Sequence, residues 1–120
     1  MDYQTLIAEI KYGIGLVWLN RPKAQNALDE TMAAEMSDAL QRFNDDPSVR
    51  VVVLAGKGGS FCAGNDLKGM ERTAGRSFQR NYAEALNFAT LLHLLDTLKK
   101  PTVARVHGFV TAGGVGLIAA

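Results

Sequence analysis

Two glycine-containing loops carry the groups of this sequence that are best suited to chemistry. The first runs from Gly56 to Asp66 and the second from Gly108 to Gly116, and each follows a short apolar run. Glycine lets the backbone approach a ligand closely and adopt positive φ, so peptide N–H groups can point into a site. Two such donors that converge on one oxygen form an oxyanion hole, which stabilises negative charge developing on a carbonyl.

The loops do not match two common phosphate-binding patterns. A Walker loop needs Ser or Thr after Gly-Lys, whereas Gly58 follows Gly56-Lys57 here. A dinucleotide-binding fingerprint that starts at Gly56 would need glycine where Phe61 stands. Backbone donation to a carbonyl oxygen therefore remains the stronger interpretation of these loops.

Two side chains near the loops, His107 and Cys62, have reactive groups, but we interpret both as structural. His107 precedes Gly108, but no Ser or Cys nucleophile lies at a known spacing from it, which favours a structural or rim role. Cys62 has no neighbour that would depress its pKa, so we interpret it as a small packing side chain.

Composition predicts one globular domain over residues 1–120 and excludes several classes of partner. Apolar residues make up 48% of the sequence and charged residues 21%, as in globular proteins. The 13 Lys and Arg nearly balance the 12 Asp and Glu, so no general affinity for nucleic acid or membranes is expected. The single cysteine excludes an intrachain disulfide. With no signal pattern and no apolar run near the ~18 residues of a membrane span, we expect a cytoplasmic protein.

The N-terminal third predicts a β-hairpin followed by a helix. The runs Thr5–Ile10 and Ile14–Leu19 are rich in β-branched and apolar residues, and Tyr12-Gly13 lies between them as a turn. Pro22 ends the second strand because it fixes φ and offers no ladder donor. Asp29 is a candidate N-cap for a helix whose apolar face contains Met32, Met36, Leu40 and Phe43.

The remaining chain predicts two buried parallel strands separated by a long helix. The strands are Val49–Ala55, buried on both faces, and Thr102–Val106. A helix from about Ser77 to Leu98 lies between them, with an apolar stripe of Phe78, Tyr82, Leu86, Ala89 and Leu92.

This order of elements, β-β-α-β-loop-α-β-turn-α, predicts an α/β fold with a largely parallel sheet. Ligands of such sheets bind beyond the carboxyl ends of the strands, where the two glycine loops would meet. A helix that begins near Gly113 and stops at Ala120 would lack a cap and a partner for its apolar face. We therefore expect this domain to be truncated at its C-terminal end.

Three blocks resemble segments of the enoyl-CoA hydratase/isomerase (crotonase) family, in order and at similar spacings. They are Asn20 to Leu28 (NRPKAQNAL), Ser60 to Lys68 (SFCAGNDLK), and Lys100-Pro101 through Leu117, and together they span most of the chain. The resemblance implies a crotonase-like spiral of ββα units, of which this is the N-terminal part, assembled as a homotrimer or as a dimer of trimers.

The resemblance also implies the site residues. The oxyanion-hole donors would be the backbone N–H groups of Asn65 and of Gly113, the middle residue of Ala112-Gly113-Gly114. Coenzyme A, as part of the acyl-CoA substrate, would contact Lys23-Ala24, and its adenine and pantetheine would meet a second set of residues, Ala63, Asn65, Asp66, Leu67 and Lys68. The resemblance implies no separate cofactor and no metal.

Less specific interpretations of these residues stay open. Gly113-Gly114 could form only a tight strand-to-helix turn, and Asn65-Asp66 an ordinary cap or Asx turn. Lys23 and Lys68 are either solvated surface charges or contacts to the phosphates of coenzyme A.

One departure from the family pattern bears on the reaction. The first of the two glutamates that serve well-known hydratases as acid and base would stand at Gly116, and the second would lie after Ala120. Glycine cannot transfer a proton, and a missing first carboxylate resembles the branch of methylglutaconyl-CoA hydratases. We expect hydration of a 2-enoyl-CoA thioester, with enoyl-CoA isomerisation or a catalytically silent acyl-CoA-binding module as alternatives. No nucleophilic serine supports a related serine protease.

Overall fold

A β-hairpin opens the fold in the computed structural model, which describes residues 2–64 and 77–120. Strands β1 (Leu6–Lys11) and β2 (Ile14–Leu19) pair antiparallel. Tyr12 and Gly13 join them with φ values of 53° and 80°, the left-handed pair that a two-residue hairpin turn requires. The predicted hairpin is confirmed.

The first long helix, α1 (Glu30–Asp45), follows the short 3-10 helix η1 (Pro22–Ala24) and begins where the sequence predicted. The side chain of Asp29 accepts a hydrogen bond from the backbone N–H of Met32 at 2.8 Å, as an N-cap does. The predicted apolar face is buried, and it contacts β1 and β2. This face forms the centre of the core with Val17, Leu19, Val52 and Leu54 of the sheet.

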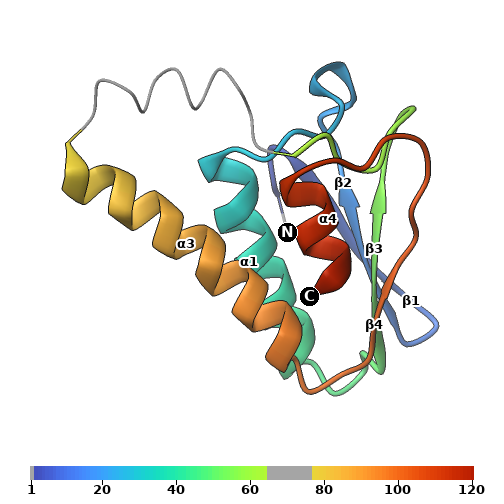
Figure 1. The fold of residues 1–120 in the computed structure, drawn as a ribbon. Coiled ribbons are helices and arrows are strands. Elements are labelled where there is room, and N and C mark those ends of the chain that lie inside the picture. Colours follow the sequence, from blue (N-terminus) through green and yellow to red (C-terminus); the bar gives the residue numbers. More distant parts are fainter. Residues whose placement is uncertain (1, 65–76) are drawn as a thin grey trace.

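Strands β3 (Val51–Gly56) and β4 (Thr102–Ala104) complete the sheet that the described residues form, in the order β1-β2-β3-β4. β3 runs parallel to both β2 and β4. In Figure 1 helices α1, α3 (Phe78–Thr97) and α4 (Gly113–Ala119) all lie on one side of this sheet. The order of elements is the predicted one.

The predicted burial of these two strands is partly wrong. Val51 and Val53 of β3 are only half-buried, because they point away from the face that the helices cover. β4 is shorter than expected and exposed: Val103 keeps 51% of its surface accessible and Val106, beyond the strand, 44%. β4 stands at an edge of the described sheet, so only one neighbouring strand shields it.

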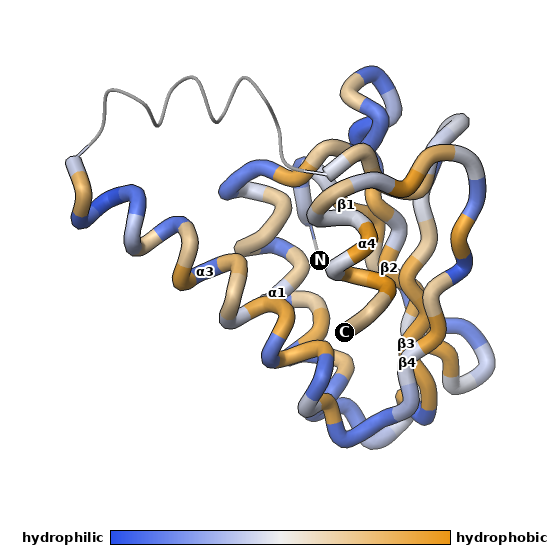
Figure 2. The backbone as a smooth tube through the Cα atoms, viewed as in Figure 1, coloured by the Kyte–Doolittle hydropathy of each residue, from blue (hydrophilic) through white to orange (hydrophobic). Residues whose placement is uncertain are grey.

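The apolar stripe predicted for α3 is wrong except at Leu92, which is half-buried and packs against the core. Phe78, Tyr82 and Leu86 are 81%, 60% and 53% exposed, whereas the buried residues are Leu91 and Leu95. α3 packs against α1, and its apolar residues gather in its C-terminal half, where the two helices lie together (Figure 2). Among the residues that the structure describes, no helix has both the length and the apolar character of a membrane span.

A carboxylate on α1 fastens the start of the chain. Glu35 accepts hydrogen bonds from the backbone N–H groups of Gln4 and Thr5 at 2.7 and 2.8 Å, and from the Thr5 hydroxyl at 2.5 Å. Burial raises the pKa of Glu35, but the hydrogen bonds from Thr5 and Gln4 together outweigh burial and lower the pKa below 4.5. The ionised form is therefore the one that folding favours.

This contact predicts a pH dependence of stability. Because the folded pKa lies below the unfolded one, Glu35 contributes its full stabilisation above pH 4.5 and loses it as the pH falls through the folded value. Glu35→Gln should lower the melting temperature at neutral pH and flatten its dependence on pH in the acid range. Thermal unfolding from pH 7 downwards measures this, with Asp96→Asn on α3 as the control. Equal slopes for wild type and Glu35→Gln would contradict the assignment.

Candidate active site at the two glycine loops

The two glycine loops run side by side and are joined by backbone hydrogen bonds. Cys62 and Val110 form a parallel bridge, in which the Cys62 N–H donates to the carbonyl of Phe109 at 3.3 Å. The N–H of Thr111 donates back to the Cys62 carbonyl at 3.2 Å, and the Thr111 hydroxyl donates to the carbonyl of Ala63 at 2.8 Å. The loops that the sequence singled out therefore meet beyond the ends of β3 and β4, as predicted.

Glycine is required where the loops touch. A Cβ on Gly64 would lie 2.9 Å from the Thr111 carbonyl oxygen and 3.3 Å from the amide nitrogen of Gly113. Gly64 also has φ of +92°, which side chains rarely adopt. A Cβ on Gly114 would lie 2.7 Å from the Cys62 carbonyl oxygen. Only hydrogen at both positions lets the two backbones approach this closely.

The predicted donor Gly113 is the first residue of α4. The first N–H groups of a helix have no partner within it, and they point outward along the positive end of its dipole. The following amides are occupied, since Gly114 donates to Thr111 and Val115 to Ala112. Within residues 2–64 and 77–120, the N–H of Gly113 has no hydrogen-bond partner. It is available to an acceptor that approaches α4 from its N-terminal end.

The second predicted donor is not described. Asn65 lies outside the described residues, as do the predicted substrate contacts Asp66, Leu67 and Lys68. The residue before Asn65 is Gly64, whose contact with Gly113 brings the chain to the N-terminus of α4. The prediction that Asn65 donates to the same oxygen as Gly113 stays a prediction.

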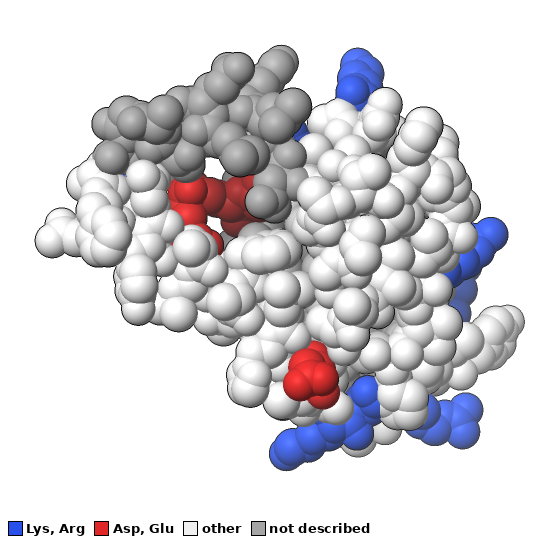
Figure 3. Space-filling view, viewed as in Figure 1, with Lys and Arg blue, Asp and Glu red and all other residues white. Residues whose placement is uncertain are grey.

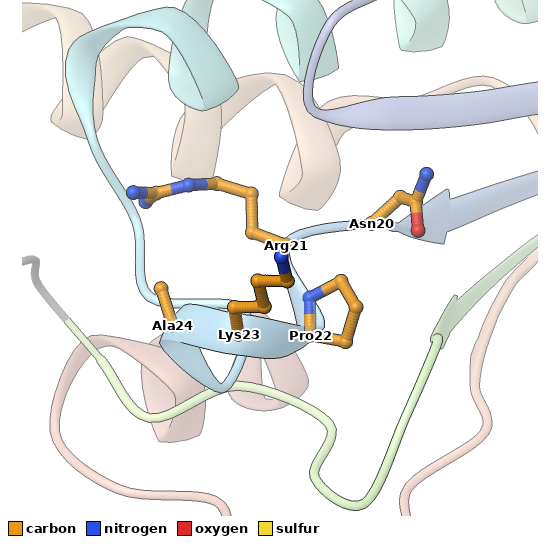
Figure 4. A pocket seen from close by; sticks show the side chains of 5 residues that line it. All are labelled: Asn20, Arg21, Pro22, Lys23 and Ala24. Atoms are coloured by element: carbon orange, nitrogen blue, oxygen red, sulfur yellow. The ribbon is translucent and has the colours of Figure 1, made fainter.

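The predicted coenzyme A contacts Lys23 and Ala24 line a pocket of about 410 Å³ together with Asn20, Arg21 and Pro22. Figure 4 shows the side chains of this segment, with Arg21 and Asn20 pointing in opposite directions. Lys23 is exposed, and a basic side chain projects from the molecule over the η1 segment in Figure 3. The N–H of Ala63 donates to the Gln25 carbonyl at 3.0 Å, so this pocket segment is fastened to the first glycine loop.

Cys62 lies in the core and His107 at the rim of the loops, as their structural interpretations predicted. Cys62 is fully buried, and burial raises the pKa of its thiol above 9.0, although the N–H of Gly64 acts in the opposite direction. A protonated, enclosed thiol is a packing group. His107 is exposed at the rim, with its Nε2 atom 2.7 Å from the carbonyl oxygen of Gly58. The described residues contain no group of three or more potential metal ligands.

One residue was missed by sequence reasoning. Asn26 is fully buried, although it is polar, and its side chain bonds to both the pocket segment and the first glycine loop. The sequence showed it only as one letter of the Asn20 to Leu28 block. The sequence around Asn26 gave no specific signal, because two of its three partners, Lys57 and Ser60, are more than thirty residues away.

Ala112, directly before the predicted donor Gly113, has a strained backbone. Its φ of 48° and ψ of −118° lie in a region that favours glycine, at a cost of roughly 1–3 kcal/mol. Ala112→Gly removes this strain. Glycine also raises the conformational entropy of the unfolded chain, which lowers the free energy of unfolding by ~0.5–1 kcal/mol, but the strain is the larger effect. We expect the melting temperature to rise by about 2–4 °C. Ala83→Gly, in the exposed interior of α3, should lower it in the same thermal unfolding assay.

If Ala112→Gly lowers the melting temperature as Ala83→Gly does, the backbone at position 112 is not strained. Activity at the neighbouring Gly113 should be retained, because the substitution removes only a methyl group from an exposed residue.

Comparisons with known proteins show which family the chain resembles. Residues 9–120 match the model of the enoyl-CoA hydratase/isomerase family. The chain is 34% identical to the crotonyl-CoA hydratase of Syntrophomonas wolfei, over 98% of this chain and 44% of that protein. It is 39% identical to the mitochondrial enoyl-CoA hydratase of Pongo abelii, over 97% of this chain and 39% of that protein.

Solved structures give the same result for the fold. The crystal structure of an enoyl-CoA hydratase from Shewanella pealeana superposes with a TM-score of 0.93 and 33% identity, over 97% of this chain and 44% of that one. The chain thus spans less than half the length of these relatives.

Proposed function

Because the chain belongs to the enoyl-CoA hydratase/isomerase family, we propose that the protein binds an acyl-CoA thioester and hydrates a 2-enoyl group. The thioester carbonyl accepts hydrogen bonds from the N–H groups of Gly113 and Asn65. Polarisation of that carbonyl makes C3 of the enoyl group electrophilic towards water. The donors contribute most to the enolate, since negative charge develops on the oxygen in the transition state.

One observation carries the proposal: the N–H of Gly113 at the start of α4, beside Gly64, has no hydrogen-bond partner among the described residues. A backbone donor fixed by helix geometry needs no reorganisation when charge develops, which is how oxyanion holes lower barriers. Relatives named enoyl-CoA hydratase and crotonyl-CoA hydratase align with nearly the whole length of this chain at 39% and 34% identity, which favours hydration over other carbonyl chemistry.

The coenzyme A moiety is proposed to contact Lys23 and Ala24 at the pocket of residues 20–24, and Ala63 beside it. Lys23 is exposed and can reach a phosphate. Residues Asp66, Leu67 and Lys68 complete this proposed contact. Coenzyme A is part of the substrate, and no separate cofactor is proposed.

The proton donor is proposed to lie outside residues 1–120, because Gly116 supplies no carboxylate. A Cβ at Gly116 would meet nothing closer than the Leu92 side chain at 4.0 Å, so the position has room for a larger residue. We further propose a cytoplasmic enzyme assembled as a homotrimer or homohexamer, which light scattering of the full-length protein would measure.

A hydration assay tests the function. The full-length protein is incubated with crotonyl-CoA, and loss of the absorbance of the conjugated thioester is followed beside a titration with free coenzyme A. Binding with turnover supports the hydratase. Binding without turnover favours the silent binding module, for which Gly116 is the specific observation. Loss of absorbance with a product of unchanged mass is double-bond migration and favours the isomerase, because hydration adds water. Absence of both binding and turnover contradicts the proposal.

A further inference from the structure

The fully buried side chain of Asn26 joins three backbone groups from two separate segments. Its Oδ1 atom accepts a hydrogen bond from the N–H of Arg21 at 2.7 Å. Its Nδ2 atom donates to the carbonyl oxygens of Lys57 and Ser60, both at 2.9 Å. One amide thus connects the pocket segment to the loop that leads to Gly64.

The three partners demand this functional group. Arg21 offers a donor, so it needs an acceptor, whereas Lys57 and Ser60 offer acceptors and need two donors. A primary amide supplies one acceptor and two N–H donors in a plane, and an ionised carboxylate supplies acceptors alone. The Nδ2 atom lies 3.0 Å from the position that a Cβ on Gly56 would occupy, which shows how closely the loop encloses the amide.

The backbone around Asn26 reinforces this junction. Gln25 and Asn26 both lie in the left-handed region, with φ values of 52° and 56°, and this bend turns the Asn26 side chain inward. The Gln25 carbonyl accepts from Ala63, and the N–H of Leu28 donates to the Gly64 carbonyl at 2.7 Å. The bend therefore contacts both the beginning and the end of the loop.

We infer that Asn26 is a positioning residue: it fixes the position of the pocket of residues 20–24 relative to the loop before residue 65. This inference rests on the proposed function, because it matters only if one acyl-CoA occupies both. Because the Asn26 side chain is fully buried, it is not placed to contact a substrate directly. It acts through Arg21 on the coenzyme A side and through Lys57 and Ser60 on the carbonyl side.

The test compares Asn26→Asp and Asn26→Ser with wild type in the full-length protein. Asn26→Asp leaves two carbonyls facing a carboxylate, and Asn26→Ser is a milder change that retains one donor and one acceptor. We expect the Kd for free coenzyme A to rise at least tenfold and kcat to fall at least tenfold in Asn26→Asp, with smaller changes in the same direction for Asn26→Ser. All constants are measured where circular dichroism shows each variant folded.

Asn44→Ala is the matched control. The Asn44 side chain also accepts a backbone N–H, that of Lys99 at 3.0 Å, but it lies at the far end of α1. This variant should lower the melting temperature while leaving Kd and kcat unchanged, which separates loss of stability from loss of positioning.

The outcomes are distinct. If wild type neither binds coenzyme A nor turns over crotonyl-CoA, the proposed function fails. If wild type does both, and folded Asn26→Ser has wild-type Kd, KM and kcat, the positioning inference alone is overturned. A lower melting temperature with unchanged constants overturns it as well. Should Asn26→Asp not fold, Asn26→Ser decides.

Discussion

Replacing Gly113 by proline should reduce turnover of crotonyl-CoA by roughly 10²–10³-fold, the usual effect of removing one oxyanion-hole donor. Proline lacks the N–H, and Gly113 is the first residue of α4, the helix position where proline is best tolerated. The substitution removes the proposed donor at a position where α4 itself tolerates proline, but proline also restricts the backbone of Ala112 before it, so circular dichroism must show the variant folded. Because the carbonyl interaction strengthens in the transition state, we expect the loss in kcat rather than in the Kd for free coenzyme A.

Gly113→Ala is the control for this experiment, because it adds a side chain at the same residue and keeps the N–H. It should retain turnover within about tenfold of wild type, since the donor survives. Steady-state kinetics and a coenzyme A titration on both variants provide the measurement. A Gly113→Pro enzyme with wild-type kcat would show that the N–H of residue 113 does not bind the reacting oxygen.

The second large effect is expected at Gly64. Gly64→Ala places a methyl group 2.9 Å from the Thr111 carbonyl oxygen and 3.0 Å from the Cβ of Ala112, at a φ of +92°. These neighbours are backbone or backbone-attached atoms and cannot rotate away, so the loops must separate. We expect a loss of about 1–3 kcal/mol in the free energy of unfolding. Turnover should fall by at least about 100-fold, because a shift near 1 Å is enough to misplace catalytic groups.

Gly59→Ala is matched to Gly64→Ala within the same loop. A Cβ at Gly59 would meet nothing within 4 Å, and its backbone lies outside the positive-φ region. This variant should therefore have wild-type stability and turnover. Denaturant unfolding and the crotonyl-CoA assay measure both variants side by side. Equal turnover for the two would mean that close contact between the loops is not needed for the reaction.

The sequence predicted the elements whose signals are local. Tyr12-Gly13 between two β-rich runs indicated the hairpin, and Asp29 followed by apolar residues at helical spacing indicated α1. In both cases the residues that decide the conformation are neighbours along the chain, so a short stretch of sequence is enough to predict it. The two glycine loops were also found, because glycine marks the places where backbones approach closely.

Burial on α3 could not be predicted in the same way. The helix has apolar residues on more than one face, and periodicity alone does not say which face finds a partner. Only Leu91 and Leu95 become buried, because α1 lies against the C-terminal half of the helix, while Phe78 and Tyr82 stack on each other at 6.2 Å and remain exposed. That choice depends on contacts between α1 and α3, which are far apart in the sequence.

The site shows the same division between local and distant causes. Gly113 was predicted as a donor from its place in the second glycine loop, and the structure places it at a helix start. Asn26 was not identified, because its role exists only once Lys57 and Ser60 have folded against it. The strained φ of Ala112 likewise has no sequence signature, since alanine at a loop end is unremarkable until its backbone angles are known.

The glycine loops are held together chiefly by main-chain bonds between Cys62 and the residues Phe109 and Thr111, to which the Thr111 hydroxyl adds one side-chain bond. Saturation mutagenesis of this region should therefore give a two-class pattern of tolerance. Exposed positions such as Phe109 would accept most residues without altering the spacing between the loops, whereas Gly64 and Gly114 would accept almost none. Sequence variation is therefore expected on the loop surface, while the spacing between the two backbones stays the same.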